Sequence, residues 1–388
     1  MSPRTDTKEL IEKLQHRLAI EPELNRDPAL LARAIREEAQ IISDVEVLEV
    51  LRRLRHDTDG LGVLEHLLNR AQVTDVVVNG PNQVFVDRGG GLEKAEIRFR
   101  DDDEVRRLAT RLAISCGQRL DDAQPFADGR INRPDGTSLR IHALLCPPAE
   151  GGTCLSVRVL RQAETSLDEL TANGTIDARI RDFLRCLVKA QVSFLVIGGT
   201  GSGKTTLLSA LLGEVEDKQR LLLIEDTAEL RPRHPHVVTV VARRPNAEGT
   251  GEITMSQLLR QALRMRPDRI VVGEIRGGEV VDLLAALNTG HDGGAGTLHA
   301  NSLEEVPARM EALAALGGLD RIGLHSQLSA AVEIVLTMRR GGAGRRYLAE
   351  IGQLHSHPVR TRVLWSRQDG RKEGFADYLA YLQQRGEQ

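Results

Sequence analysis

The sequence lacks a long apolar run, and this absence excludes a membrane-spanning helix. Its longest apolar stretch, around Val192 to Ile197, is far shorter than the ~20 residues that a bilayer crossing requires. The amino-terminal segment MSPRTDTKELIEKL also lacks the apolar core of a signal peptide. Any association with a membrane is therefore expected to come through a partner.

Cysteine pairs are missing as well. The four cysteines form no CxxC pair, and their spacing fits neither a zinc site nor a secreted disulfide framework. A reducing, cytosolic compartment fits this pattern best. The four positions are Cys116, Cys146, Cys154 and Cys186.

An excess of basic residues is also absent, because 52 Lys and Arg stand against 55 Asp and Glu, for a formal net charge of −3. This balance disfavours a dedicated nucleic-acid-binding protein. Apolar residues make up 41% and charged residues 28%, which is typical of a folded globular chain. With 388 residues the chain exceeds the usual size of one core, so we expect two packed domains plus smaller appendages.

Periodicity divides the amino-terminal part of the chain into three regions. Apolar residues at helical spacing predict a helical segment over 1–60, interrupted at Pro22 and Pro28. Short strands, a helix capped by Asp102 or Asp103 and ending before Gly117, and a hairpin predict an α+β domain over 61–160. The polar stretch 161–175 is interpreted as a hinge.

Beyond Ile176 the pattern changes, because apolar strands alternate with helical segments as in a mostly parallel sheet with flanking helices. We interpret 176–352 as this α/β domain. The segment 353–388, which contains the only Trp, has no motif that we can interpret. The predicted strands are Phe194–Ile197, Leu221–Glu225, Val237–Val241, Ile270–Gly273 and Glu333–Met338.

The strongest motif is GGTGSGKT, residues 198–205, a complete GxxxxGK[ST] match between a predicted strand and a predicted helix. Glycines let backbone N–H groups surround phosphates, and the helix amino terminus adds positive potential. Lys204 is expected to neutralise the β- and γ-phosphates of ATP, and the Thr205 hydroxyl to bind Mg²⁺. The predicted cofactor-binding residues are Gly199, Thr200, Gly201, Ser202, Gly203, Lys204, Thr205 and Thr206.

Acidic residues follow two other predicted strands. Glu225 and Asp226 follow 221–224, and Glu274 follows 270–273. The carboxyl ends of parallel strands converge on the ligand crevice, so these carboxylates are expected near the γ-phosphate. There a carboxylate holds Mg²⁺ or orients the attacking water.

Three further segments make the pattern specific. IEDTAEL resembles the Asp box of type II and type IV secretion ATPases, VVGEIRGGE resembles their Walker B segment, and TGHDGGAGTLHANS resembles their His box. The region from ELRPRHPHV to NTGHDGG is most similar to the CpaF/TadA branch, the motors of tight-adherence (Flp) pili. The resemblance covers roughly residues 60–350. It implies a RecA-like P-loop core preceded by a smaller α+β, PAS-like domain.

The resemblance also implies roles for individual residues. Glu225 would activate water, with Glu229 in reserve, and Glu274 would be the Walker B carboxylate that, with Thr205, holds the metal. His299 matches the residue that links the γ-phosphate to domain movement. His291 and Arg276 match flanking positions of these boxes.

Arginines from the first domain are expected to help neutralise the γ-phosphate. Arg140 in SLRIHA and Arg158 in LSVRV fall where the family places such arginines. Arg130 and Arg161 are weaker candidates, and an ordinary role on a strand face is the alternative for each.

The resemblance implies a homohexameric, cytoplasmic ATPase, bound to the inner face of the membrane through a platform protein, that drives pilin or substrate movement. Two alternatives remain open: a conjugation-type DNA translocation ATPase or helicase-like motor, and an assembly factor that binds ATP but barely hydrolyses it. Nucleic acid is not the expected partner, given the charge balance. Some relatives carry a paired-CxxC metal module, but this chain has no cysteine after Cys186.

Overall fold

The computed structural model describes residues 28–39, 61–68, 70, 72–133, 137–160, 165–243, 245, 250–356 and 359–387, and the isolated positions 10, 13, 14, 17 and 47. Its contacts divide the chain into unit 1, Met1–Leu160, and unit 2, Arg161–Gln388. Helix α2, Pro28–Ala39, begins at the proline expected to interrupt the amino-terminal segment. Most of that segment, and Arg161, lie outside the described residues. Among the described residues, no helix has the length and apolar character needed to cross a membrane.

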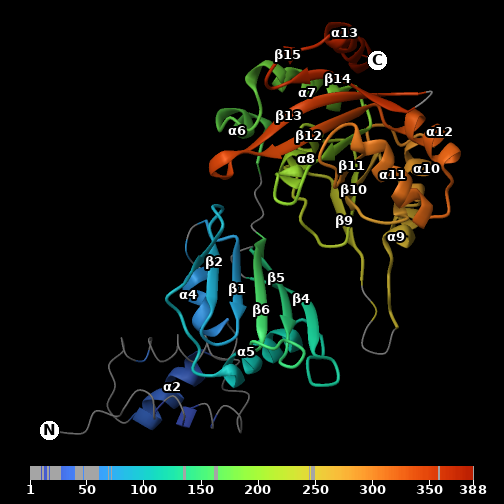
Figure 1. Ribbon diagram of the computed structural model, residues 1–388. Coiled ribbons are helices and arrows are strands. Elements are labelled where there is room, and N and C mark those ends of the chain that lie inside the picture. Colours follow the sequence, from blue (N-terminus) through green and yellow to red (C-terminus); the bar gives the residue numbers. More distant parts are fainter. Residues whose placement is uncertain are drawn as a thin grey trace. The chain divides into compact units, whose positions relative to one another are not determined.

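Unit 1 is built on a six-stranded antiparallel sheet in the order β3-β2-β1-β6-β5-β4 (Figure 1). Alternate residues of the central strands are buried against helix α5, Asp102–Ser115, and short α4, Glu65–Leu68. This is the predicted α+β arrangement. The strands are β1 Asp75–Asn79, β2 Val84–Asp87, β3 Leu92–Lys94, β4 Phe126–Asn132, β5 Ser138–Leu144 and β6 Cys154–Leu160.

The ends of α5 show how local chemistry sets the helix boundaries. Its N-cap is Asp101, whose side chain accepts the Glu104 N–H, so the expected cap at Asp102 or Asp103 was wrong by one or two positions. Asp102 instead binds the backbone N–H and hydroxyl of Thr153. Gly117 has φ +69°, as predicted for a residue that ends a helix in the left-handed conformation.

Part of the stretch interpreted as a hinge is helical. Helix α6, Leu167–Ala172, begins with a capping box in which Ser166 and Glu169 satisfy each other's backbone N–H groups. Leu167 and Leu170 are buried in the core of unit 2. This helix was not predicted from the sequence, because the stretch is largely polar and its few apolar residues fall on one helical face.

Unit 2 contains a nine-stranded sheet in the order β15-β14-β13-β12-β7-β11-β10-β8-β9. The strands from β12 to β9 are parallel, whereas β13, β14 and β15 are antiparallel. All five predicted strands are present, as β7 Phe194–Ile197, β8 Leu221–Glu225, β9 Val237–Val241, β10 Arg269–Ile275 and β12 Ile334–Arg340. Strand β11, Ala295–Leu298, was missed because its sequence AGTL consists largely of small residues.

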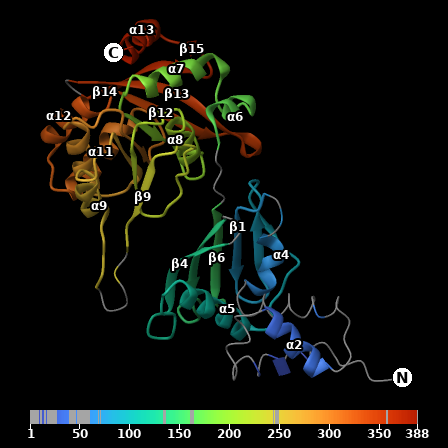
Figure 2. The same cartoon turned by 180° about the vertical axis from the view of Figure 1, so that it is seen from behind.

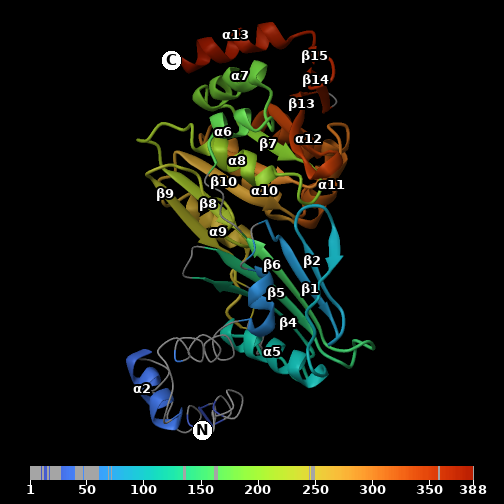
Figure 3. The ribbon, with the colours of Figure 1, turned by 90° about the vertical axis from the view of Figure 1, so that its left-hand side faces the viewer.

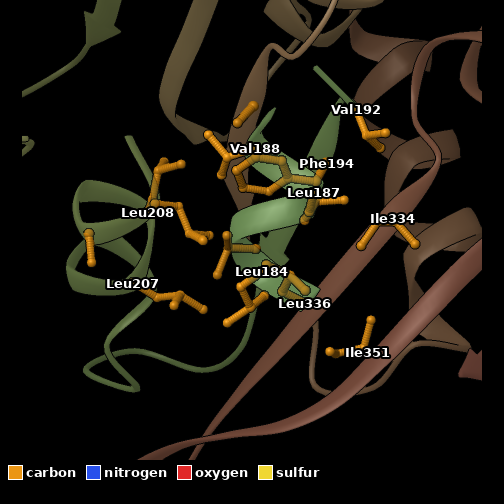
Figure 4. Close-up of a cluster of buried hydrophobic side chains, with 14 of the residues drawn as sticks. Leu184, Leu187, Val188, Val192, Phe194, Leu207, Leu208, Ile334, Leu336 and Ile351 are labelled. Atoms are coloured by element: carbon orange, nitrogen blue, oxygen red, sulfur yellow. The ribbon is translucent and has the colours of Figure 1, made fainter. Parts of the chain in front are cut away.

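Alternating side chains of the parallel strands pack against helices on both faces. On β7, Phe194 and Val196 face one cluster, and Leu195 and Ile197 face the other. The first cluster packs on α6, α7 Ala178–Lys189, α8 Lys204–Leu212 and α13 Phe375–Gly386. Figure 4 shows its side chains from α7 and α8 beside Phe194 of β7. The second packs on α10 Glu279–Leu287 and on α9 Met255–Ala262, α11 Glu305–Leu316 and α12 Arg321–Ala331, of which the last three are labelled in Figure 2.

The carboxyl-terminal segment, which the sequence left without interpretation, belongs to unit 2. Strands β13 Arg346–His355, β14 Arg360–Ser366 and β15 Gly370–Arg371 extend the sheet. Helix α13 then lies along α7 (Figure 3), where Phe375 stacks on Phe183 with ring centroids 5.0 Å apart. Trp365 is 1% exposed within the same core.

Candidate functional site

The four motif segments emerge at one edge of the unit 2 sheet. GGTGSGKT follows β7, His299 of the His box follows β11, Glu274 of Walker B lies near the end of β10, and the Asp box begins at the end of β8. These strands are adjacent and parallel in the order β7-β11-β10-β8, so their carboxyl ends meet side by side. Neighbouring strands are only about 4.8 Å apart, which brings residues far apart in the sequence within reach of each other.

Glycine conformations shape the loop after β7. Gly198, Gly201 and Gly203 have φ angles of +148°, +70° and +96°, which residues other than glycine rarely adopt. A side chain at Gly198 would also collide with the carbonyl oxygen of Met338 on β12. The loop leads directly into α8, whose first N–H groups have no intrahelical acceptor and are free to bind an anion.

Lys204 begins α8 and is 7% exposed. Its ammonium group donates hydrogen bonds to the Gly198 and Gly199 carbonyl oxygens, at 2.9 and 3.1 Å. Burial lowers the pKa of Lys204, while the charges of Glu274 and Glu229 oppose that shift. The lysine is thus held over the glycine loop and within the field of two carboxylates.

Glu274 lies near the end of β10, where the pairing with β11 shifts register between Val272 and Ile275. Such an irregularity re-aims side chains at the end of a strand. Glu274 forms an ion pair with Arg276, and its Oε1 lies 2.5 Å from His299 Nε2. Arg276 Nη1 also donates to Asp226 Oδ2 at 2.8 Å, so one arginine joins the carboxylates of β8 and β10.

The His299 imidazole is held between charges of opposite sign. Burial lowers its pKa, and the nearby Lys204 and Arg276 charges act in the same direction, while Glu274 raises it. The pKa of His299 therefore lies below the ordinary value for histidine, which favours the neutral ring. The other histidine of the His box, His291, instead lies within hydrogen-bonding distance of Ala286 O, at 3.2 Å.

Glu225, the last residue of β8, is 2% exposed. Its Oε2 accepts the backbone N–H groups of Glu229 and Leu230, at 2.8 and 3.0 Å. Its Oε1 is buried and has no hydrogen-bond partner among the described residues. Burial raises the pKa of Glu225 to about 7. The side chain thereby fixes the Asp-box loop, in which Glu229 is exposed.

Gly273 explains how Glu225 reaches this position. A Cβ atom at Gly273 would lie 2.8 Å from Glu225 Cγ and 3.1 Å from its Oε2. The Gly273 carbonyl oxygen is held by the Thr297 hydroxyl of β11 at 2.6 Å. The sequence analysis missed both contacts, although glycine directly before the Walker B glutamate was a visible signal.

Arg140 and Arg158 lie in unit 1 on neighbouring strands. Arg130 pairs with Arg140 across β4 and β5, and Arg140 pairs with Arg158 across β5 and β6. Three guanidinium groups thus share one cross-strand row. Arg158 is neutralised by Asp75 at 2.9 Å, whereas Arg140 makes no hydrogen bond or ion pair with the other described residues. Like charges directly opposite each other are unfavourable, and an anion would relieve their repulsion.

The glycine loop, the buried lysine and the adjacent carboxylates form a P-loop arrangement at the carboxyl edge of an α/β core. Residues 57–340 match the family T2SSE, "Type II/IV secretion system protein". The chain belongs to this family.

Relatives agree with this assignment, and two solved structures share the fold. A Mycobacterium tuberculosis protein whose name refers to conjugal transfer is 57% identical over 84% of this chain and 93% of its own length. The type IV secretion system protein PtlH of Bordetella pertussis is 33% identical over 74% and 91%. The pilus retraction motor PilT with bound ADP has a TM-score of 0.55 at 20% identity over 84% and 87%, which shows a shared fold. The ATPase DotB of Legionella pneumophila gives 0.52 at 21% identity over 76% and 80%.

Proposed function

We propose that this chain is an ATP-hydrolysing motor of a type IV secretion, conjugal transfer or pilus-assembly machine. The observation that carries the proposal is the meeting of Lys204, Glu274, His299 and the Asp box at the end of four adjacent parallel strands. Relatives named for conjugal transfer and type IV secretion support the secretion context. The CpaF/TadA branch, with movement of pilins, remains the narrower form of the proposal, based on motif resemblance.

The residues of the P-loop and Glu274 fit a nucleoside triphosphate with Mg²⁺. The loop glycines leave space, since an added Cβ at Gly199 would meet nothing within 4 Å. Thr205 is the hydroxyl and Glu274 the carboxylate that would hold the ion, which are ligand types that Mg²⁺ prefers. When bound, the ion neutralises charge on the β- and γ-phosphates. Lys204 supplies a second positive charge at the same place.

Two glutamates of the Asp box are candidates for activating the attacking water. Glu225 is nearly inaccessible, and one of its oxygens holds the backbone N–H of Glu229. Glu229 is exposed, and its charge acts on Lys204. We therefore assign the contact with water to Glu229 and make Glu225, the first expectation, a positioning residue. Glu229→Gln should lower kcat with little change in KM. Glu225→Gln should in addition loosen the Asp-box loop, because Glu225 accepts the Glu229 and Leu230 N–H groups.

In this proposal His299 senses the occupied site through Glu274, and Arg276 links Glu274 to the Asp box. Arg140 provides further positive charge for the γ-phosphate, and Arg158 would do so only after its ion pair with Asp75 is broken. The unpartnered Arg140 side chain in a row of guanidinium groups supports an anion-binding role for unit 1. A homohexamer that acts on a membrane platform protein from the cytoplasm would couple hydrolysis to transport.

Hydrolysis by variants tests the site directly. Lys204→Ala and Glu274→Gln should each reduce ATP turnover by roughly 100-fold or more, because both groups act on the charge that develops during transfer. Lys218→Ala is a matched control, since among the described residues this exposed lysine pairs only with Glu216. Wild-type turnover in either site variant would defeat the assignment.

A second function, a DNA-translocating motor, is favoured by the conjugal-transfer names of several relatives. Its mark would be turnover that is stimulated by DNA and depends steeply on salt. We expect no stimulation, because the chain has no basic excess. DNA-stimulated hydrolysis at physiological salt would replace the secretion proposal with the DNA motor.

A further inference from the structure

Strand β9 forms one edge of the unit 2 sheet, and among the described strands it pairs with β8 alone. The Leu221 N–H donates to His236 O at one end of this pairing, and the Ala242 N–H donates to Glu225 O at the other. Because the backbone groups of successive strand residues alternate in direction, the even-numbered residues from 236 to 242 face β8. The odd-numbered residues present their backbone groups to the opposite side.

These outward-facing backbone groups are unpaired among the described residues. The N–H and C=O groups of Val237, Thr239 and Val241 make no hydrogen bond with another residue that the structure describes. A row of such donors and acceptors at a sheet edge is able to bind a further strand.

The sequence of β9 does not protect this edge. Exposed edge strands are usually very short, or carry charges, proline or a bulge. Strand β9 consists of VVTVV, and its pairing with β8 has no register shift. The other edge strands of the two described sheets differ, since β15 has two residues, β3 contains Glu93 and Lys94, and β4 contains Asp128 and Arg130.

The side chains of β9 are incompletely covered. Val238 and Val240 pack, partly buried, against one core cluster of unit 2, and Val237 packs against the other. Val241 is 41% exposed. A further strand on this edge would remove more of these valine side chains from water, which favours β-branched residues at the centre of the incoming segment.

Basic residues flank β9 on both sides. The sequence reads RPRHPH before the strand and ARR after it. Arg231 and Arg243 are exposed, and neither forms an ion pair with another described residue. Pairing of β9 with the same strand of a second copy would bring one basic flank against another, which is unfavourable. Acidic residues at the ends of an incoming strand would instead complement these charges.

We propose that the outer edge of β9 binds an extended segment of a partner protein, with β-branched residues at its centre and acidic residues at both ends. The segment adds one strand to the unit 2 sheet through the backbone of Val237, Thr239 and Val241, and its carboxylates meet Arg231 and Arg243. Nucleotide is not required for this contact, so the inference goes beyond the ATPase proposal and each can fail without the other.

The probe is the fluorescein-labelled peptide Glu-Glu-Val-Thr-Val-Thr-Val-Glu-Glu, titrated with the full chain by fluorescence anisotropy. Thr239→Pro removes one outward N–H but no hydrogen bond to β8, and proline is tolerated at such an edge position. This variant should bind the peptide at least tenfold more weakly than wild type and hydrolyse ATP within twofold of it. Thr239→Val keeps the N–H and should bind as wild type does. Equal affinity of Thr239→Pro and wild type, or no saturable binding to wild type, would overturn the proposal.

Arg243→Glu tests the charge complementarity. It should weaken binding of the acidic peptide at least fivefold and strengthen binding of the same peptide with Lys in place of each Glu. Arg309→Glu is the matched control, because Arg309 is exposed on α11 and lies outside β9 and its flanks. Tighter binding of the lysine peptide than of the glutamate peptide by wild type would show that the partner is not acidic and overturn the proposal.

Hydrogen exchange of the wild-type chain tests the edge without any variant. The amides of Val237, Thr239 and Val241 should exchange rapidly in the free chain and at least tenfold more slowly with saturating glutamate peptide. Unchanged exchange at these positions would overturn the proposal. Self-association that Thr239→Pro abolishes, with no peptide binding by wild type, would assign the edge to a second copy and overturn it as well.

Discussion

At the scale of single residues, the site requires that position 273 carry no Cβ atom. Glu225 occupies the space that a Cβ at this position would need, with 2.8 Å to its Cγ. Since Glu225 Oε2 in turn holds the Glu229 and Leu230 N–H groups, one added methyl group would displace the Asp-box loop.

Gly273→Ala should therefore reduce ATP turnover by about tenfold or more, because small displacements at a reacting centre are costly. Steady-state hydrolysis measures the effect. Gly90→Ala is the control, since a Cβ there meets nothing within 4 Å and its φ is not in the left-handed region. Unchanged turnover in Gly273→Ala would show that the position of Glu225 does not matter.

The raised pKa of Glu225 predicts a pH dependence of stability. An unfolded glutamic acid loses its proton near its ordinary pKa of 4.5, whereas the folded chain keeps it until about 7. The folded state thus binds more protons between pH 4.5 and 7, so the free energy of unfolding falls as pH rises through that window and then levels. The loss amounts to roughly 3 kcal/mol at most.

Glu225→Gln should remove this contribution. Unfolding by urea between pH 4.5 and 8 should show a smaller decline in the variant than in wild type, with the largest difference above pH 7. Parallel curves for the two proteins would contradict the buried, protonated glutamate.

At the scale of elements, α13 is held to the core by aromatic packing and one acidic residue. Phe375 is 1% exposed and stacks on Phe183 of α7. Tyr378 and Arg385 both donate to the Glu333 carboxylate, at 3.1 and 2.7 Å. The helix is therefore an integral part of unit 2.

Phe375→Ala should lower the free energy of unfolding of unit 2 by about 3–5 kcal/mol, the usual cost of deleting a buried phenyl ring. Emission from Trp365, the only tryptophan, reports the transition because it lies in the same core. Ile322→Ala, at a side chain 82% exposed, should change stability by less than about 0.5 kcal/mol. Equal stability of Phe375→Ala and wild type would mean that α13 is dispensable.

The elements also show which parts of the fold were predictable. Strands such as Leu221–Glu225 are buried on both faces and read as continuous apolar runs, so the sequence located them. Strand β11 was missed because tight packing requires small residues there: a Cβ on Gly296 would lie 3.0 Å from Ile275 Cδ1. Strands β13 and β14 do not alternate regularly between exposed and buried residues, and register shifts interrupt their pairing, so the sequence gave no clear period.

Some candidate site residues could likewise be predicted from the sequence, and others could not. Lys204, Glu274 and His299 were predictable because their motifs specify both residue type and strand end. Thr297 was not, since its contact with the Gly273 carbonyl oxygen depends on a neighbouring strand that only the folded sheet supplies. Burial distinguished Glu225 from Glu229, and no pattern within IEDTAEL encodes that difference.

At the scale of the whole molecule, the proposed ring predicts concentration-dependent activity. If neighbouring copies complete the site, specific ATPase activity should rise with protein concentration until assembly is complete. Measuring turnover alongside sedimentation velocity tests this. Constant specific activity from a monomer would remove the hexamer from the proposal.

The most direct measurement is a structure of the full chain with Mg²⁺ and a non-hydrolysable ATP analogue. The expected result places a γ-phosphate oxygen about 3 Å from Lys204 Nζ, with the Glu274 carboxylate and Thr205 hydroxyl at the metal. A nucleotide bound elsewhere, or the β8 and β10 carboxylates pointing away from its terminal phosphate, would contradict the motor assignment.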